Sequence, residues 1–97
     1  MTYKELRLAL KVFDLGERAT LNEIKSRHRE LVKKYHPDAG SDDSAELRKV
    51  NAAYRVLLDY VGSYRFSFAE EEFYEQNPEE RMLRQFMDEA FWEREDD

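Results

Sequence analysis

A histidine, a proline and an aspartate follow one another at residues 36–38, directly after a stretch rich in lysine and arginine. Imidazole and carboxylate groups serve in acid–base catalysis, but the side chains of His36 and Asp38 flank a proline and so point in different directions. The chain has no cysteine, and no serine lies in a setting that would activate it as a nucleophile. His28 and His36 have the wrong spacing for two ligands of one metal ion. We therefore expect no enzyme activity, no metal and no cofactor.

This tripeptide suits recognition by a partner better than catalysis. Pro37 has no N–H group and disfavours helical geometry at the residue before it, so a helix arriving from the N-terminal side must stop near Tyr35. His36 and Asp38 are then expected at the tip of a loop between two helices. A stiff, charged loop tip is well placed to contact another protein.

The helix that leads into this loop has a clear start and a clear apolar face. Thr20 and Glu23 have the spacing of a capping box, in which the threonine hydroxyl accepts from the N–H of Glu23 and the glutamate reaches back to the N–H of Thr20. Apolar positions then recur every three or four residues. Because His28 lies on this face, we expect it to be packed in the core. The face comprises Leu21, Ile24, His28, Leu31 and Tyr35.

The opposite face of the same helix is basic. Lys25, Arg29 and Lys33 follow one another at intervals of four residues, and Arg27 and Lys34 widen the strip. A solvated surface is the ordinary explanation for such charges. Their position directly before the loop favours a docking surface instead, with a basic helix face and an acidic tip that together would attract an acidic patch on a partner.

Two further helices are expected to pack against this one. Residues 3–12 place Leu6 and Leu10 on one face, with Phe13 continuing it, and Gly16 is the expected left-handed residue after this helix.

The third helix follows the eight-residue loop and runs to about residue 61. Two long helices joined by so short a loop must lie antiparallel, with the first helix packed across them. The apolar face of the third helix comprises Leu47, Val50, Tyr54, Leu57, Leu58 and Val61.

Composition agrees with a small all-α domain. The 97 residues are 41% apolar and 39% charged, and only three glycines and two prolines are present, which favours helices over turn-rich β structure. No apolar run approaches the roughly 20 residues of a membrane-spanning helix, and the N-terminus has no apolar signal segment. Without cysteine, disulfides and the common structural zinc sites are excluded. We expect a cytoplasmic protein without membrane contact.

The charge is unevenly distributed along the chain. Residues 70–97 carry twelve acidic residues and three arginines, a balance of −9, whereas the rest of the chain has a balance of +3. Such asymmetry points to an interaction segment or an intramolecular contact, not to nucleic-acid binding. We divide the chain into a helical module at 1–62, an aromatic and acidic linker at 63–77, and an acidic amphipathic helix with its tail at 78–97.

The C-terminal helix is expected at residues 78–93, with Pro78 in its first turn. Its apolar stripe needs a cover, which could be the module, a partner or a second copy of the chain. The candidate interface residues are Leu83, Phe86, Met87 and Phe91.

Thr20–Asp38, followed by Asn51–Leu57, resembles the J domain of DnaJ-type co-chaperones, and the resemblance covers about residues 3–61. The matching motifs are the His-Pro-Asp tripeptide after Lys-Tyr at 34–38, Glu-Ile-Lys at 23–25 and Ala-Tyr-x-x-Leu at 53–57. The resemblance implies an antiparallel hairpin of helices II and III with a short packed N-terminal helix. It also implies binding to a DnaK-type heat-shock chaperone and stimulation of its ATPase.

Site residues also follow from the resemblance. His36, Pro37 and Asp38 would form the signal loop, with Asp38 pairing with an arginine of the chaperone and Pro37 holding the geometry. Lys25 and Arg29 would face an acidic patch on the chaperone. Arg27 and Lys33 would assist them.

Three departures from the family pattern stand out. His28 occupies a position where an aromatic residue is usual, and the loop after Asp38 is short, with Ala39 and Gly40 where a basic residue is common. The basic fourth helix of DnaJ is replaced by Gly62–Phe68, and neither a Gly/Phe-rich region nor zinc-binding cysteines follow. The chain therefore looks like a minimal J-domain protein or a fragment of a longer one, with client or targeting specificity left to residues 63–97.

Two alternatives remain for the tail and one for the whole chain. The acidic tail could screen the basic helix from the chaperone, or the apolar stripe could be a ligand for a partner's groove or a dimer seam. The chain could also be a J-like scaffold that binds a partner through the C-terminal aromatic helix without stimulating any ATPase.

Overall fold

The computed structural model describes residues 1–37 and 44–95, with side chains up to residue 90. Within these residues all regular secondary structure is helical, which confirms the expected all-α class. No helix among them is long and apolar enough to cross a membrane. The chain forms two compact units, Met1–Tyr64 and Arg65–Asp97.

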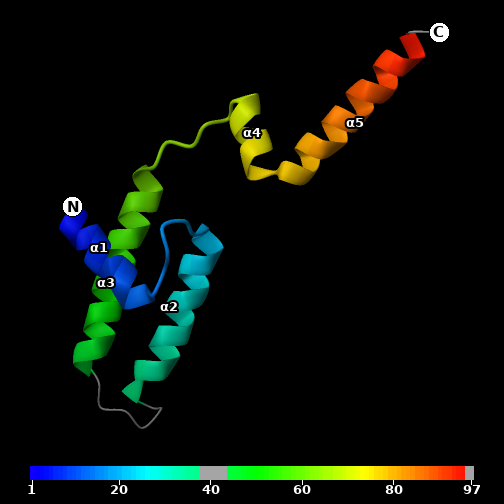
Figure 1. The fold of residues 1–97 in the computed structure, drawn as a ribbon. Coiled ribbons are helices and arrows are strands. Elements are labelled where there is room, and N and C mark those ends of the chain that lie inside the picture. Colours follow the sequence, from blue (N-terminus) through cyan, green and yellow to red (C-terminus); the bar gives the residue numbers. More distant parts are fainter. Residues whose placement is uncertain (38–43, 96–97) are drawn as a thin grey trace. The chain divides into compact units, whose positions relative to one another are not determined.

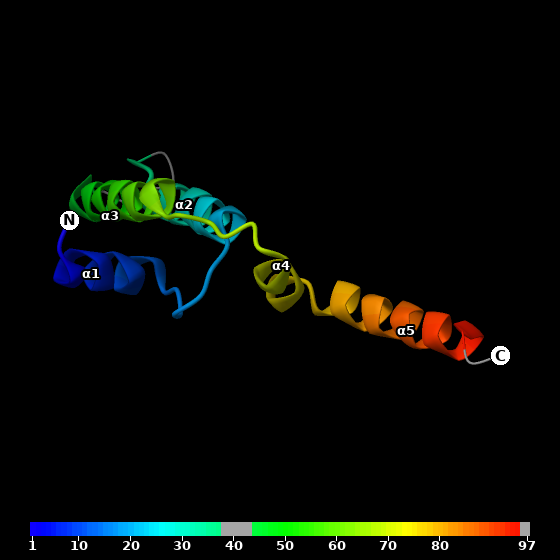
Figure 2. The same ribbon diagram turned by 90° about the horizontal axis from the view of Figure 1, so that it is seen from above.

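The first unit is built on an antiparallel helix pair. α2 (Leu21–Tyr35) and α3 (Ser44–Ser63) run in opposite directions side by side, and α1 (Tyr3–Phe13) packs across α3 (Figures 1 and 2). Buried residues lie where the three helices meet. The buried core consists of Ala9, Phe13, Ile24, Val50, Ala53 and Leu57.

α1 has capping at both ends. At its start the Thr2 side chain accepts from the N–H of Glu5 at 3.2 Å, and the Glu5 carboxylate accepts from the N–H of Thr2, a complete capping box. At its end the left-handed residue is Asp14, with φ of 51°, and not Gly16 as the sequence suggested. The N–H groups of Asp14 and Leu15 donate to the carbonyls of Lys11 and Leu10, the pair of bonds that closes a Schellman motif.

α2 begins and ends where the sequence predicted. The Thr20 hydroxyl accepts from the N–H of Glu23 at 3.1 Å, so the predicted N-terminal cap is present, but the reciprocal bond from the Thr20 N–H to the Glu23 carboxylate is not formed, and the predicted capping box is therefore only half complete. The helix ends at Tyr35, and His36 is extended, with φ of −69° and ψ of 137°. This is the conformation that Pro37 favours at the residue before it.

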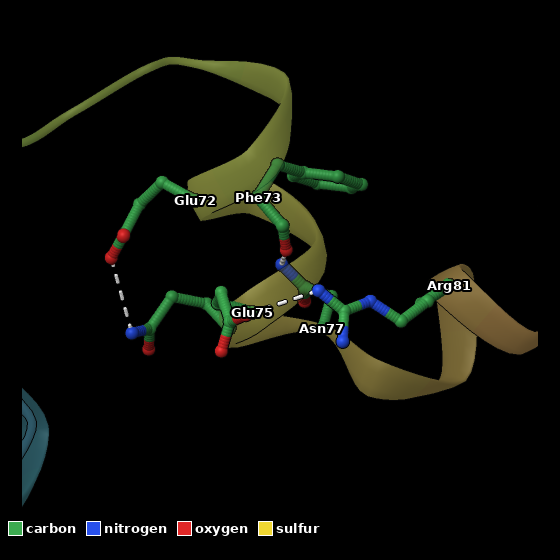
Figure 3. Close-up of polar contacts among 6 residues, drawn as sticks. Glu72, Phe73, Glu75, Asn77 and Arg81 are labelled. Atoms are coloured by element: carbon green, nitrogen blue, oxygen red, sulfur yellow. Dashed lines mark hydrogen bonds and ion pairs between the residues drawn. The ribbon is translucent and has the colours of Figure 1, made fainter.

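The second unit contains a helix that we did not predict. α4 (Glu70–Gln76) lies within the stretch expected to be a linker, and α5 (Pro78–Glu95) follows after one residue. Asn77 contacts both helices. Its side-chain amide donates to the Phe73 carbonyl at 2.9 Å (Figure 3). Its own carbonyl accepts from the N–H groups of Glu80 and Arg81. Residues 64–69 are not helical, in agreement with the expected loss of a fourth helix directly after the module.

Candidate protein-docking surface

Three basic side chains form an exposed row along α2. Lys25, Arg29 and Lys33 are all exposed, and one helical turn separates each from the next. Lys25 and Lys33 form no ion pair with any residue that the structure describes. Arg29 donates to the Ser26 hydroxyl at 3.1 Å, which orients its guanidinium and leaves its charge unneutralised. The row therefore gives α2 a positive surface of the kind that attracts carboxylate groups.

Arg27 differs from these three residues. Its guanidinium lies 3.4 Å from the Glu30 carboxylate, and its side chain is 40% exposed. Such an exposed pair one turn apart contributes little to stability, but it offsets part of the positive charge at this position. We therefore expect Arg27 to contribute less to the candidate docking surface than Lys25 or Arg29.

The row of positive charge leads to the start of the loop. His36 and Pro37 are exposed at the end of α2, and Asp38 lies outside the described residues. Tyr35 is half-buried against the core, and the Lys34 ammonium lies 5.3 Å from the centre of its ring. Packing of Tyr35 thus fixes the direction in which the chain leaves α2.

An aromatic stack fastens the middle of α2 to α3. The His28 ring lies parallel to the Tyr54 ring at 3.7 Å between centres, and the Phe13 ring lies 6.3 Å from His28 at a similar orientation. His28 Nε2 is 3.1 Å from Asn51 Oδ1. The expected packing of His28 is confirmed, although it is half-buried and not fully buried. The role of Asn51 was missed, although its one-turn spacing from Tyr54 places both on the same side of α3.

The apolar stripe predicted for the C-terminal helix lies on α5 in the second unit. Leu83, Phe86 and Met87 are 58%, 69% and 65% exposed, and Met82 beside them is 70% exposed. Phe91 lies in α5, but its side chain is outside the described part. The predicted site residues therefore belong to two different surfaces, a basic one on α2 and an apolar one on α5.

Comparison with known proteins identifies relatives of the first unit. The sequence model of the DnaJ domain matches residues 9–62. The chaperone protein DnaJ of Finegoldia magna is 45% identical over 51 residues, which are 50% of this chain and 14% of that protein. A curved DNA-binding protein of Coxiella burnetii is 43% identical over 51 residues, 50% of this chain and 16% of that protein.

A DnaJ-like protein of Mycoplasma pneumoniae is 39% identical over 62 residues, which are 58% of this chain and 20% of that protein. The chain thus spans no more than about one fifth of the length of these relatives. No solved structure matches it at a significant level. The matched region includes α2, the loop and most of α3.

Proposed function

The chain belongs to the DnaJ domain family, and we propose that it is a co-chaperone module that binds a DnaK-type heat-shock chaperone and stimulates its ATPase. The observation that carries the proposal is the exposed row of Lys25, Arg29 and Lys33, which runs along one face of α2 toward His36 and Pro37 at its end. The family match covers this whole surface.

In this proposal the row and the loop have different tasks. Lys25 and Arg29 attract an acidic patch on the chaperone. Lys33 assists them, and Arg27 does so to a smaller extent. Charges of opposite sign accelerate the encounter of the two proteins and fix their orientation. His36 and Pro37 present Asp38 to an arginine of the chaperone. Hydrolysis itself takes place in the chaperone, so the module contributes no catalytic group.

A second candidate is a scaffold that binds a partner through α5 without stimulating an ATPase. The exposed apolar stripe on α5 favours it, because the stripe lies outside the family match and the first unit does not require it for its core. The two candidates differ in one measurable property, which is the effect on ATP hydrolysis.

Single-turnover ATP hydrolysis by a DnaK-type chaperone separates the candidates. We expect the parent chain to accelerate hydrolysis and its His36→Gln variant to lose that effect, while the circular dichroism of the two remains the same because His36 is exposed outside the core. A parent chain that leaves hydrolysis unchanged, with and without residues 70–97, would favour the scaffold.

A further inference from the structure

The apolar stripe of α5 has the spacing of a helix that docks into a groove. Leu83, Phe86, Met87 and Ala90 recur at intervals of three, one and three residues, so they lie on one side of the helix. Leu83, Phe86 and Met87 are more than half exposed, and α4 in the same unit leaves them uncovered. Exposed aromatic and methionine side chains in such a row are typical of a protein–protein contact.

Arg81 and Arg84 of α5 are paired with carboxylates of α4. Arg81 donates to the Glu75 carboxylate at 3.1 Å (Figure 3). Arg84 pairs with the Glu70 carboxylate, and its guanidinium lies 5.2 Å from the centre of the Tyr74 ring. These contacts direct the Arg81 and Arg84 charges toward α4 carboxylates, and Arg84 also lies 3.7 Å from the Asp88 carboxylate of α5.

The acidic residues next to the stripe remain unpaired. Glu79 and Glu80 precede Leu83 by four and three residues and so continue the stripe toward the start of the helix, and Glu89 borders it one turn after Phe86. All three glutamates are exposed, and none forms an ion pair with a residue that the structure describes. The stripe is therefore apolar at its centre and negative at its border.

The α4–α5 corner is preorganised for binding. The Asn77 side chain caps the end of α4, and the Arg81–Glu75 pair bridges the two helices (Figure 3). The Asn77 carbonyl accepts the first backbone bonds of α5. A helix that is already formed loses less conformational entropy when it docks than a disordered segment does.

We propose that α5 is a helical ligand for a protein partner whose apolar groove is bordered by lysine and arginine side chains. A second copy of the chain fits poorly, because it would bring together two segments that each carry a balance of −9 over residues 70–97. An anionic lipid surface would repel the same charge. This partner is additional to the chaperone of the proposed function and uses different residues.

Binding of the full chain to two synthetic probes tests the proposal. One probe is an antiparallel two-helix peptide with a leucine-lined groove between rows of lysine, and its twin carries glutamate in place of lysine. Fluorescence anisotropy of the labelled probes at about 50 mM salt should give at least a tenfold lower Kd for the lysine probe, and the difference should shrink as salt screens the charges.

Variants of α5 assign this binding to the stripe and its border. Leu83→Ala and Phe86→Ala should each raise the Kd for the lysine probe by roughly tenfold, as expected of anchor residues. The double variant Glu80→Lys with Glu89→Lys should lose most of the preference for the lysine probe. Gln85→Ala is the matched control, because Gln85 lies on the side of α5 away from the stripe and should bind like the parent.

Three results would overturn the proposal. The first is equal affinity of the parent for the two probes. The second is sedimentation showing a dimer of the parent that Phe86→Ala dissociates, which would assign the stripe to a second copy. The third is binding to phosphatidylglycerol vesicles that Phe86→Ala abolishes, which would assign it to a membrane.

Discussion

Asp14 shows how a single residue can terminate a helix in an unfavourable conformation. Its φ of 51° lies in the left-handed region, where a side chain with Cβ is strained and glycine is not. The conformation persists because the N–H groups of Asp14 and Leu15 satisfy two carbonyls at the end of α1. These two hydrogen bonds therefore offset the strain of the left-handed backbone at Asp14.

Replacing Asp14 by glycine should stabilise the first unit. Relief of the left-handed strain exceeds the greater entropy of glycine in the unfolded chain, so we expect the free energy of unfolding to rise by about 0.5–1 kcal/mol. Urea denaturation followed by circular dichroism measures the change. Asp14→Val serves as the control and should lower stability; a glycine variant less stable than the parent would contradict this account.

The aromatic stack around His28 allows a second prediction about single residues. His28→Ala removes the parallel contact with Tyr54 and the hydrogen bond to Asn51, and we expect a loss of about 2 kcal/mol. Asn51→Ala removes only the hydrogen bond from an exposed residue and should cost at most about 1 kcal/mol. Equal losses in the two variants would mean that the stack contributes nothing.

The position of a single residue could be predicted where the sequence pattern allowed only one arrangement. The His28 position follows from its place on the apolar face of α2. The left-handed residue at the end of α1 was predicted wrongly. Glycine is the usual residue in this conformation, and Gly16 lies two residues away, but the hydrogen bonds that select Asp14 depend on where α1 ends. Asn51 was missed because its partner lies 23 residues away in the sequence.

At the scale of elements, α2 carries the proposed docking surface, and its stability depends on its N-terminal cap. Thr20→Ala removes the hydroxyl that accepts from the N–H of Glu23, and we expect about 1 kcal/mol of destabilisation. Thr20→Ser keeps the hydroxyl acceptor, so its free energy of unfolding should differ from that of the parent by no more than roughly a few tenths of a kcal/mol. Thermal unfolding of the three chains measures the difference, and an alanine variant as stable as the serine variant would contradict the role of the cap.

Four of the five helices in the described residues were predicted, because each has an apolar face of several turns or a clear boundary residue. α4 was missed. It has seven residues, three of them consecutive glutamates, and much of its support comes from contacts that the sequence pattern does not reveal. Arg84 pairs with Glu70, and Arg81 pairs with Glu75, so the helix depends on the next element of the chain.

At the scale of the molecule, the chain consists of two units, and every buried core residue among the described ones belongs to Met1–Tyr64. We therefore predict that a chain ending at Tyr64 folds without the rest. Its midpoint of thermal unfolding should lie within about 3 °C of that of the full chain. For a domain of this size, such a shift corresponds to a difference of well under about 1 kcal/mol in the free energy of unfolding. A decrease of 10 °C or more would show that residues 65–97 contribute to the core of the first unit.

The central claim is that the basic row of α2 and the loop after it act on a DnaK-type chaperone. The most direct test is the rate of single-turnover ATP hydrolysis with the parent, Lys25→Glu and the matched control Lys4→Glu, whose exposed lysine lies on α1 outside the row. We expect the parent and Lys4→Glu to accelerate hydrolysis equally and Lys25→Glu to lose most of the effect at low salt. Equal rates for all three chains, or no acceleration by the parent, would contradict the claim.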